Sequence, residues 1–104
     1  MAFTGNEDHT IDLDTASKWT ANLRETINPE ETIAEFFGKK HIQSILDQED
    51  CVGLRIYYSL DPDGKKHLVI CGAKAYEDDI VNGKLAEAAL TSPPMIGAFN
   101  TLNS

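Results

Sequence analysis

Positive charge is scarce in this sequence of 104 residues. Nine lysine and arginine residues stand against 17 aspartate and glutamate residues, and the formal net charge at pH 7 is −8. The basic residues gather only in two short clusters, at residues 39–41 and 65–67. An acidic surface repels phosphate backbones, and neither cluster is long enough to reverse that repulsion. We therefore expect no nucleic-acid partner.

Long apolar runs are missing, and cysteines are few. No apolar stretch approaches the roughly 18 residues of a membrane-spanning helix, and no amphipathic segment has a basic face, so we expect no membrane association. Cys51 and Cys71 are the only cysteines, and they have neither metal-ligand nor redox spacing. The N-terminal segment MAFTGNEDHT has neither the basic region nor the apolar region of a secretory signal. These features predict a cytoplasmic location.

The rest of the composition is that of one small globular domain. A hydrophobic fraction of 41% is ordinary for such a domain, and the chain is long enough for a single modest core. Apolar residues recur at three- and four-residue spacing from about residue 12 to residue 27, which predicts an amphipathic helix with Asp12 as its N-cap. A second helix is predicted over residues 39–48.

The segments around these helices carry weaker patterns. Residues 28–37 begin with the Asn-Pro-Glu-Glu of a helix start, yet the TIAEFF that follows is typical of a strand. We expect a turn and then a short strand there, and a brief helix over residues 84–90. Residues 1–9 are expected to be flexible, residues 10–90 to form the domain, and residues 91–104 to be an irregular tail.

The strongest local pattern is a β-hairpin made of residues 51–60 and 65–75. The turn Asp61-Pro62-Asp63-Gly64 places proline where φ is fixed and glycine where φ must be positive, as a type I turn with a glycine bulge requires. Pairing of Asp61 with Lys65 then sets the register of both strands. The predicted fold class is α+β, a small antiparallel sheet built on this hairpin with both helices packed on one face. A third strand is expected from residues 32–37 or 76–81.

The register assigns the side chains of the hairpin to two faces. One face is expected to be buried as core, and we call it the even face: Val52, Leu54, Ile56, Tyr58, Leu60, Leu68 and Ile70. We call the opposite face the odd face. Its candidate interaction residues are Arg55, Tyr57, His67, Val69 and Cys71, and the other residues on it are Cys51, Gly53, Ser59 and Ala73.

Chemistry on the odd face centres on Cys71. Arg55 lies opposite Cys71 in the predicted register, and a guanidinium beside a thiol lowers the pKa of the thiol and makes it nucleophilic. The more common alternative is a cysteine packed in a strand as a small hydrophobe. A disulfide with Cys51 is not expected, because the two positions lie four strand residues apart, or about 13 Å.

Metal and catalytic motifs are not found. His67 and Cys71 are four residues apart on one strand with no third ligand positioned by sequence, so no metal site is expected. The Asp61-x-Asp63-Gly64 turn lacks the later ligands of a calcium loop. No serine–histidine–aspartate pattern or glycine-rich phosphate loop is present, so we expect no cofactor and favour a protein that is not an enzyme.

Three stretches carry a resemblance to a known family: DTASKWTANLRE (Asp14–Glu25), EFFGKKHIQSILDQEDCVGLRIYYSLDPDGKKHLVICG (Glu35–Gly72), and the Pro93-Pro94 pair. In these stretches the chain resembles a family of small uncharacterised proteins from Bacteroidetes-type bacteria. Members of that family often end in a Cys-Pro-Pro-x-x-Cys segment, whereas this chain has Ser92 and Gly97 at the two cysteine positions. The resemblance implies an intact bacterial domain and no particular activity, substrate or cofactor.

These observations favour a non-catalytic protein-interaction or regulatory module. Arginine and aromatic side chains beside aliphatic ones on the odd face are typical of interface centres. The partner would be another protein or a second copy of the chain, since pairing in a homodimer is one way to protect the edge of so small a sheet. The alternative is a small-molecule-binding or thiol-dependent enzyme that uses Arg55, His67 and Cys71. A third interpretation buries the odd face as core.

Overall fold

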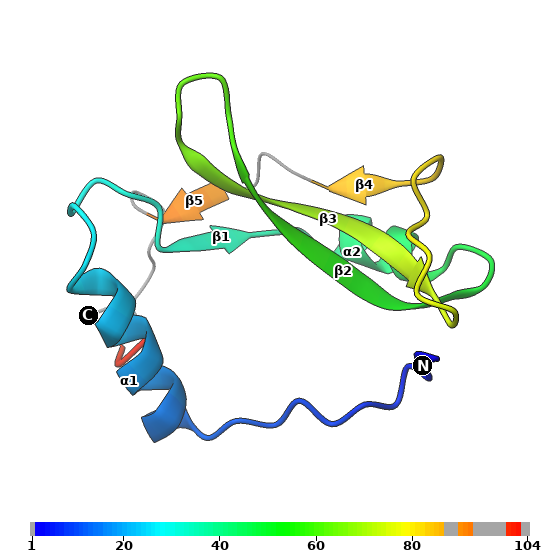
Figure 1. The fold of residues 1–104 in the computed structure, drawn as a ribbon, viewed down its shortest axis with the longest axis horizontal. Helices are drawn as coiled ribbons and strands as arrows, with labels where there is room; N and C mark the ends of the chain where they lie inside the picture. Colours follow the sequence, from blue (N-terminus) through cyan, green and yellow to red (C-terminus); the bar gives the residue numbers. More distant parts are fainter. Residues whose placement is uncertain (1, 87–89, 93–99, 103–104) are drawn as a thin grey trace.

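The computed structural model describes residues 2–86, 90–92 and 100–102, and the fold is shown in Figure 1. The elements are two helices and five strands: α1 (Leu13–Arg24), β1 (Ala34–Phe36), α2 (Lys39–Leu46), β2 (Cys51–Leu60), β3 (Lys66–Lys74), β4 (Leu85–Ala86) and β5 (Leu90–Ser92). They form a three-stranded antiparallel sheet in the order β2-β3-β4 and a two-stranded sheet of β1 and β5. The predicted α+β class is confirmed.

The hairpin of β2 and β3 has the predicted register. Arg55 pairs with Cys71, Tyr57 with Val69, and Ser59 with His67. At the turn, Asp61 N–H donates to Lys65 O at 2.8 Å, and Gly64 has the positive φ of 80° that the bulge requires. The register shifts by one residue between Cys51 and Gly53. This shift moves Cys51 off the odd face, where we had expected it, because an extra residue reverses the side-chain alternation.

The third strand of the hairpin sheet comes from a place that the sequence did not indicate. β4 pairs with β3 through Ile70–Ala86 and Cys71–Leu85, and Ala86 is buried. The prediction of a helix over residues 84–90 is wrong at residues 85–86, since a segment this short gains more from pairing with β3 than from a single helical turn. Residues 87–89 lie outside the described residues.

The segment from residue 28 to residue 37 contains the short strand that we expected, and this strand joins the second sheet. β1 pairs with β5 through Glu35–Thr91 and its neighbours. β5 runs two residues into the tail that was expected to be irregular, and residues 93–99 and 103–104 of that tail lie outside the described residues.

The core lies at the base of the hairpin, where α2 packs on the even face. Ile45 of α2 is fully buried against Ile70 and Ala86, and Phe37 and Ile42 pack around them. α2 has eight residues and is about 12 Å long, whereas the ten residues of β2 extend about 33 Å. The helix therefore covers only the base of the even face.

The distal half of the even face is exposed, contrary to the prediction that the whole face is core. Tyr58 is 91% exposed, and Ile56 and Leu60 are also exposed. The reason is the position of α1, which was expected to pack on this face with α2. Figure 1 shows α1 standing apart from the hairpin, and α1 has no buried residue.

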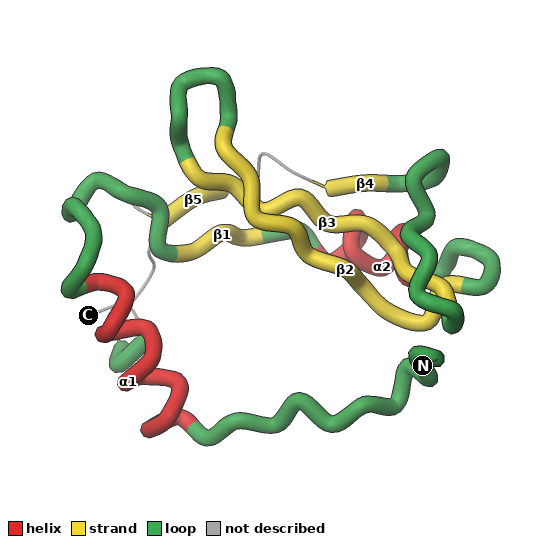
Figure 2. The backbone as a smooth tube through the Cα atoms, viewed as in Figure 1, coloured by secondary structure: helices red, strands yellow, loops and turns green. Residues whose placement is uncertain are grey.

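α1 forms as predicted from its local sequence. The side chain of Asp12 accepts a hydrogen bond from Thr15 N–H at 2.7 Å, and Arg24 lies in the last turn, where a positive charge suits the helix dipole. Residues 100–102 lie beside the helix (Figures 1 and 2). Ser17 Oγ donates a hydrogen bond to Thr101 Oγ1 at 2.6 Å. Trp19, on another side of the helix, is exposed.

The chain folds into an open shape. Its radius of gyration is 15.3 Å, against the roughly 13 Å of a compact domain of this length. At the N-terminal end, Phe3 N–H donates to Ala75 O at 2.6 Å, which places part of the segment expected to be flexible against the base of the hairpin. Residues 6–11 are exposed and lead from there to α1 (Figure 1).

Candidate functional site

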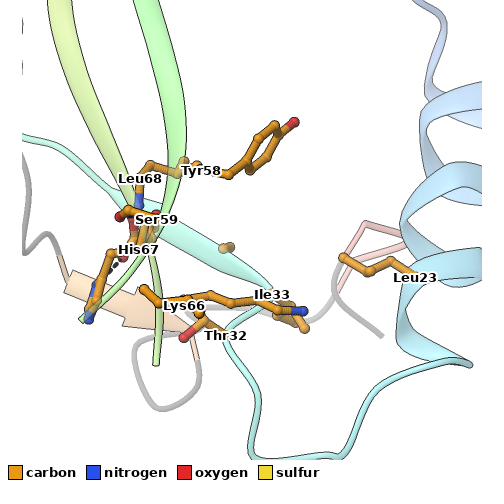
Figure 3. Close-up of a pocket in the computed structure, with 11 residues that line it drawn as sticks. Leu23, Thr32, Ile33, Tyr58, Ser59, Lys66, His67 and Leu68 are labelled. Carbon is orange, nitrogen blue, oxygen red and sulfur yellow. Dashed lines mark hydrogen bonds and ion pairs between the residues drawn. The ribbon is translucent and has the colours of Figure 1, made fainter. Parts of the chain in front are cut away.

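A groove of about 770 Å³ lies between α1, the segment before β1, and the distal half of the hairpin. Figure 3 shows Leu23 of α1 reaching toward Ile33 and the side chains of the hairpin. The residues that line the groove are Leu23, Thr32, Ile33, Ala34, Glu35, Tyr58, Ser59, Leu60, Lys66, His67 and Leu68. The volume is in the range of small-molecule sites, and most of the lining is aliphatic or aromatic.

His67 forms the polar wall of the groove, between two carboxylates. Its Nδ1 lies 2.8 Å from Glu35 Oε2 of β1, and its Nε2 lies 3.0 Å from Asp61 Oδ2 of the hairpin turn. The side chain of Glu35 is 2% exposed, and its other oxygen accepts a hydrogen bond from Leu68 N–H at 2.6 Å. The Glu35 carboxylate therefore joins the two sheets through two bonds to β3.

The two carboxylates raise the pKa of His67 above its ordinary value, the hydrogen bond with Glu35 being the larger cause and that with Asp61 the next. The protonated imidazole can donate to both carboxylates at once, whereas a neutral ring can donate to only one. The pKa of Asp61 is lowered in turn, chiefly by the backbone N–H of Lys65. His67 is therefore best satisfied as a cation.

Charge at the rim of the groove is paired within the chain. Lys66 Nζ lies 3.2 Å from Glu31 Oε2, and both nitrogens of His67 face carboxylates. Cations that already have partners offer little to an anionic ligand, because a ligand must displace a carboxylate to bind them. The groove is thus suited to an apolar occupant.

A second polar cluster lies at the base of the odd face, around Asp79. Asp79 follows β3 and forms a bridge back to Ala73. Tyr57 Oη donates a hydrogen bond to Asp79 Oδ2, and Arg55 Nε lies 3.3 Å from Asp79 Oδ1. Arg55 also lies over the ring of Phe3, 5.4 Å from its centre. Arg55 is therefore engaged on several sides by its own chain.

Cys71 is buried beside this cluster. Burial raises the pKa of its thiol, and the charge of Asp79 raises it further, against the weaker opposing effect of Arg55. The predicted pairing of Arg55 with Cys71 is present, yet the guanidinium is matched with Asp79 and does not activate the thiol. Both cysteines are free. The separation that the sequence suggested assumed an unbroken register, which the shift at Cys51 changes.

The structure divides the five candidate residues of the odd face. His67 belongs to the groove, Arg55 and Tyr57 belong to the Asp79 cluster, and Cys71 is buried beside that cluster. Val69 is half-buried between the two. The carboxylates that organise both places, Glu35 and Asp79, come from segments distant in the sequence, and no local pattern identified them.

Tyr58 and Leu60, which line the groove, were predicted to be buried in the core. The register placed them correctly on the even face, and only the position of α1 decides whether that face is covered.

Comparisons with protein-family models, with curated proteins and with solved structures give no match to this chain. The resemblance to a bacterial family therefore stays a prediction. Among the residues described, no group of three or more histidine, cysteine, aspartate or glutamate side chains is arranged to hold a metal ion. None of the described helices is long and apolar enough to cross a membrane.

Proposed function

We propose that this chain is a non-catalytic protein-interaction module whose binding surface is the distal even face of the hairpin together with the groove beside it. The observation that carries the proposal is Tyr58, which is 91% exposed on a strand between other exposed apolar side chains. Contiguous apolar surface of this kind is uncommon on a monomer and marks interaction sites. Tyrosine is also among the side chains that dominate binding energy at interfaces.

The charge of the chain supports a protein partner. A net charge of −8 disfavours nucleic acid, and the rim of the groove holds its cations in ion pairs. Two free cysteines fit a reducing compartment, so we place the module in the cytoplasm. The odd face contributes less than we expected from the sequence, because Arg55 and Tyr57 are occupied by Asp79.

Tyrosine footprinting in cells tests the proposal. Tyr58 and Tyr76 are 91% and 84% exposed, and Tyr76 lies away from the groove in the turn after β3, so the two form a matched pair. A tyrosine-directed covalent label applied to intact cells should modify Tyr76 and spare Tyr58. Equal modification of both residues would contradict the proposal.

A second candidate function is the binding of a small apolar molecule, which the volume of the groove supports. An apolar fluorescent dye would then bind wild-type protein with one-to-one stoichiometry and lose affinity in Leu60→Ser. The thiol-dependent alternative has less support, because Cys71 is buried with a raised pKa. Alkylation of Cys71 in the native protein would be needed to favour it.

A further inference from the structure

Among the residues that the structure describes, none pairs with the outer edge of β2 beyond its first residues. β2 is the end strand of its sheet, and within the described part of the chain its only strand partner is β3. Residues near Gly5 lie against Val52 at the start of the strand, so the open edge runs from Leu54 to Leu60. Natural proteins protect such edges with lysine, proline or a bulge, and residues 54–60 contain neither lysine nor proline and keep a regular register.

The backbone groups on this edge can be identified from the turn. Asp61 N–H bonds to Lys65 O, and hydrogen-bonded pairs recur every second residue in an antiparallel ladder. The odd-numbered residues of β2 therefore bond to β3. The amides of the even-numbered residues, Leu54, Ile56, Tyr58 and Leu60, point to the open edge.

Two copies of this edge are complementary to each other. A two-fold axis perpendicular to the sheet is the symmetry that makes two neighbouring strands antiparallel, and it keeps the even faces of both copies on one side. An axis at Tyr57 uses the whole open edge, pairing Leu54 with Leu60 of the second copy and Ile56 with Tyr58 of the second copy. Aliphatic and aromatic residues in such cross-strand pairs stabilise a sheet.

Charge does not oppose this pairing. Arg55 is the only charged residue of β2, and in this register it faces Ser59 of the second copy. Its charge is already matched by Asp79 of its own chain. The edge therefore brings no two like charges together, although each copy carries a net charge of −8.

The apolar side chains along the edge also gain contacts from this pairing. Ile56, Tyr58 and Leu60 are 50%, 91% and 68% exposed in one copy, and each meets an apolar side chain of the second copy across the new pair. The even faces then lie side by side, so the pairing covers the flanks of these side chains. Leu23 lines the groove with Tyr58 and Leu60, which places α1 beside this surface.

From the open edge, the symmetry and the apolar pairs across the edge, we infer that the partner of this module is a second copy of the chain, and that β2 pairs with β2 to make one continuous six-stranded sheet. The inference rests on the proposed function, since the second copy pairs along the strand that carries the same apolar side chains. The two even faces then form one apolar surface flanked by both α1 helices.

Sedimentation equilibrium of Tyr58→Lys and Tyr76→Lys tests the inference. Both tyrosines are exposed, so neither substitution removes a buried side chain, and circular dichroism verifies the fold. We expect wild type and Tyr76→Lys to sediment at twice the chain mass of 11.5 kDa, and Tyr58→Lys to sediment as a monomer. A wild type that stays monomeric at all concentrations, or a Tyr58→Lys dimer as tight as wild type, would overturn it.

The footprint of Tyr58 separates failure of this inference from failure of the proposed function. Wild type that is monomeric in solution, with Tyr58 still protected in cells, would replace the second copy with a different protein partner. Modification of Tyr58 in cells to the level of Tyr76 would remove the proposed function itself.

Discussion

His67 is the side chain that ties the two sheets together. It lies between Glu35 of β1 and Asp61 of the hairpin turn, and the backbone of the next residue donates to Glu35 as well. The wall of the groove thus depends on one imidazole whose protonation decides how many of these bonds form. The stability of the arrangement should therefore vary with pH.

The direction of that dependence follows from the raised pKa of His67. A group with a raised pKa in the folded state adds stability below its unfolded pKa, about 6.5, and loses it as pH rises through the folded pKa. We expect the urea concentration at the unfolding midpoint of wild type to fall as pH rises from about 6 to about 9. In His67→Gln, the midpoint should stay constant over this pH range. Asp61 has a lowered pKa, so its own contribution is lost only at acid pH, outside this range.

His9→Gln serves as the control for this measurement, because His9 lies in the exposed N-terminal segment. It should keep the wild-type pH dependence. An unchanged slope in His67→Gln would show that the two carboxylates do not act through this histidine.

At the scale of elements, α2 packs against the base of the hairpin. Among the described residues, α1 is held by its own hydrogen bonds and by those with Thr101 and Leu102. Isolated helices of α1's length, 12 residues, are marginal in water. The two helices differ in burial: α2 places the fully buried Ile45 against β3 and β4, whereas the residues of α1 are at most half-buried.

Truncation of Ile45 measures the contribution of α2. Ile45 is fully buried, so Ile45→Ala should lower the free energy of unfolding by about 3 kcal/mol, within the usual range of 2–5 kcal/mol for a core cavity. Leu46→Ala, one residue along the same helix on its more exposed side, should cost less than about 1 kcal/mol. Equal losses in urea denaturation would contradict the assignment of the core to the base of the hairpin.

The sequence predicted those elements whose causes are local. The hairpin register follows from four turn residues, and α1 follows from a cap and a stripe of apolar residues. The pairing of β1 with β5 and the two residues of β4 depend on segments far apart in the chain, so no local pattern could predict them. The same holds for the site: His67 was a candidate, but Glu35 and Asp79 reach their partners only through the fold.

For the whole molecule, the central feature is its open shape. The radius of gyration exceeds that of a compact domain, the distal even face is uncovered, and the outer edge of β2 is unpaired within the described residues. Each of these is unusual for a lone chain. The unpaired edge, with apolar side chains along it, is what one half of a larger sheet would show.

Amide hydrogen exchange of β2 in the purified protein tests this account most directly. In a lone hairpin, the amides that face β3, such as those of Arg55 and Tyr57, exchange slowly, and those of Ile56 and Tyr58 exchange at nearly the rate of an open chain. Pairing of β2 with a second copy predicts slow exchange at all four amides. The protection of Ile56 and Tyr58 should then be lost when the protein is diluted. In Tyr58→Lys, the amide of Ile56 should exchange fast at every concentration. Fast exchange at Ile56 and Tyr58 under conditions where Arg55 and Tyr57 are protected would contradict the account.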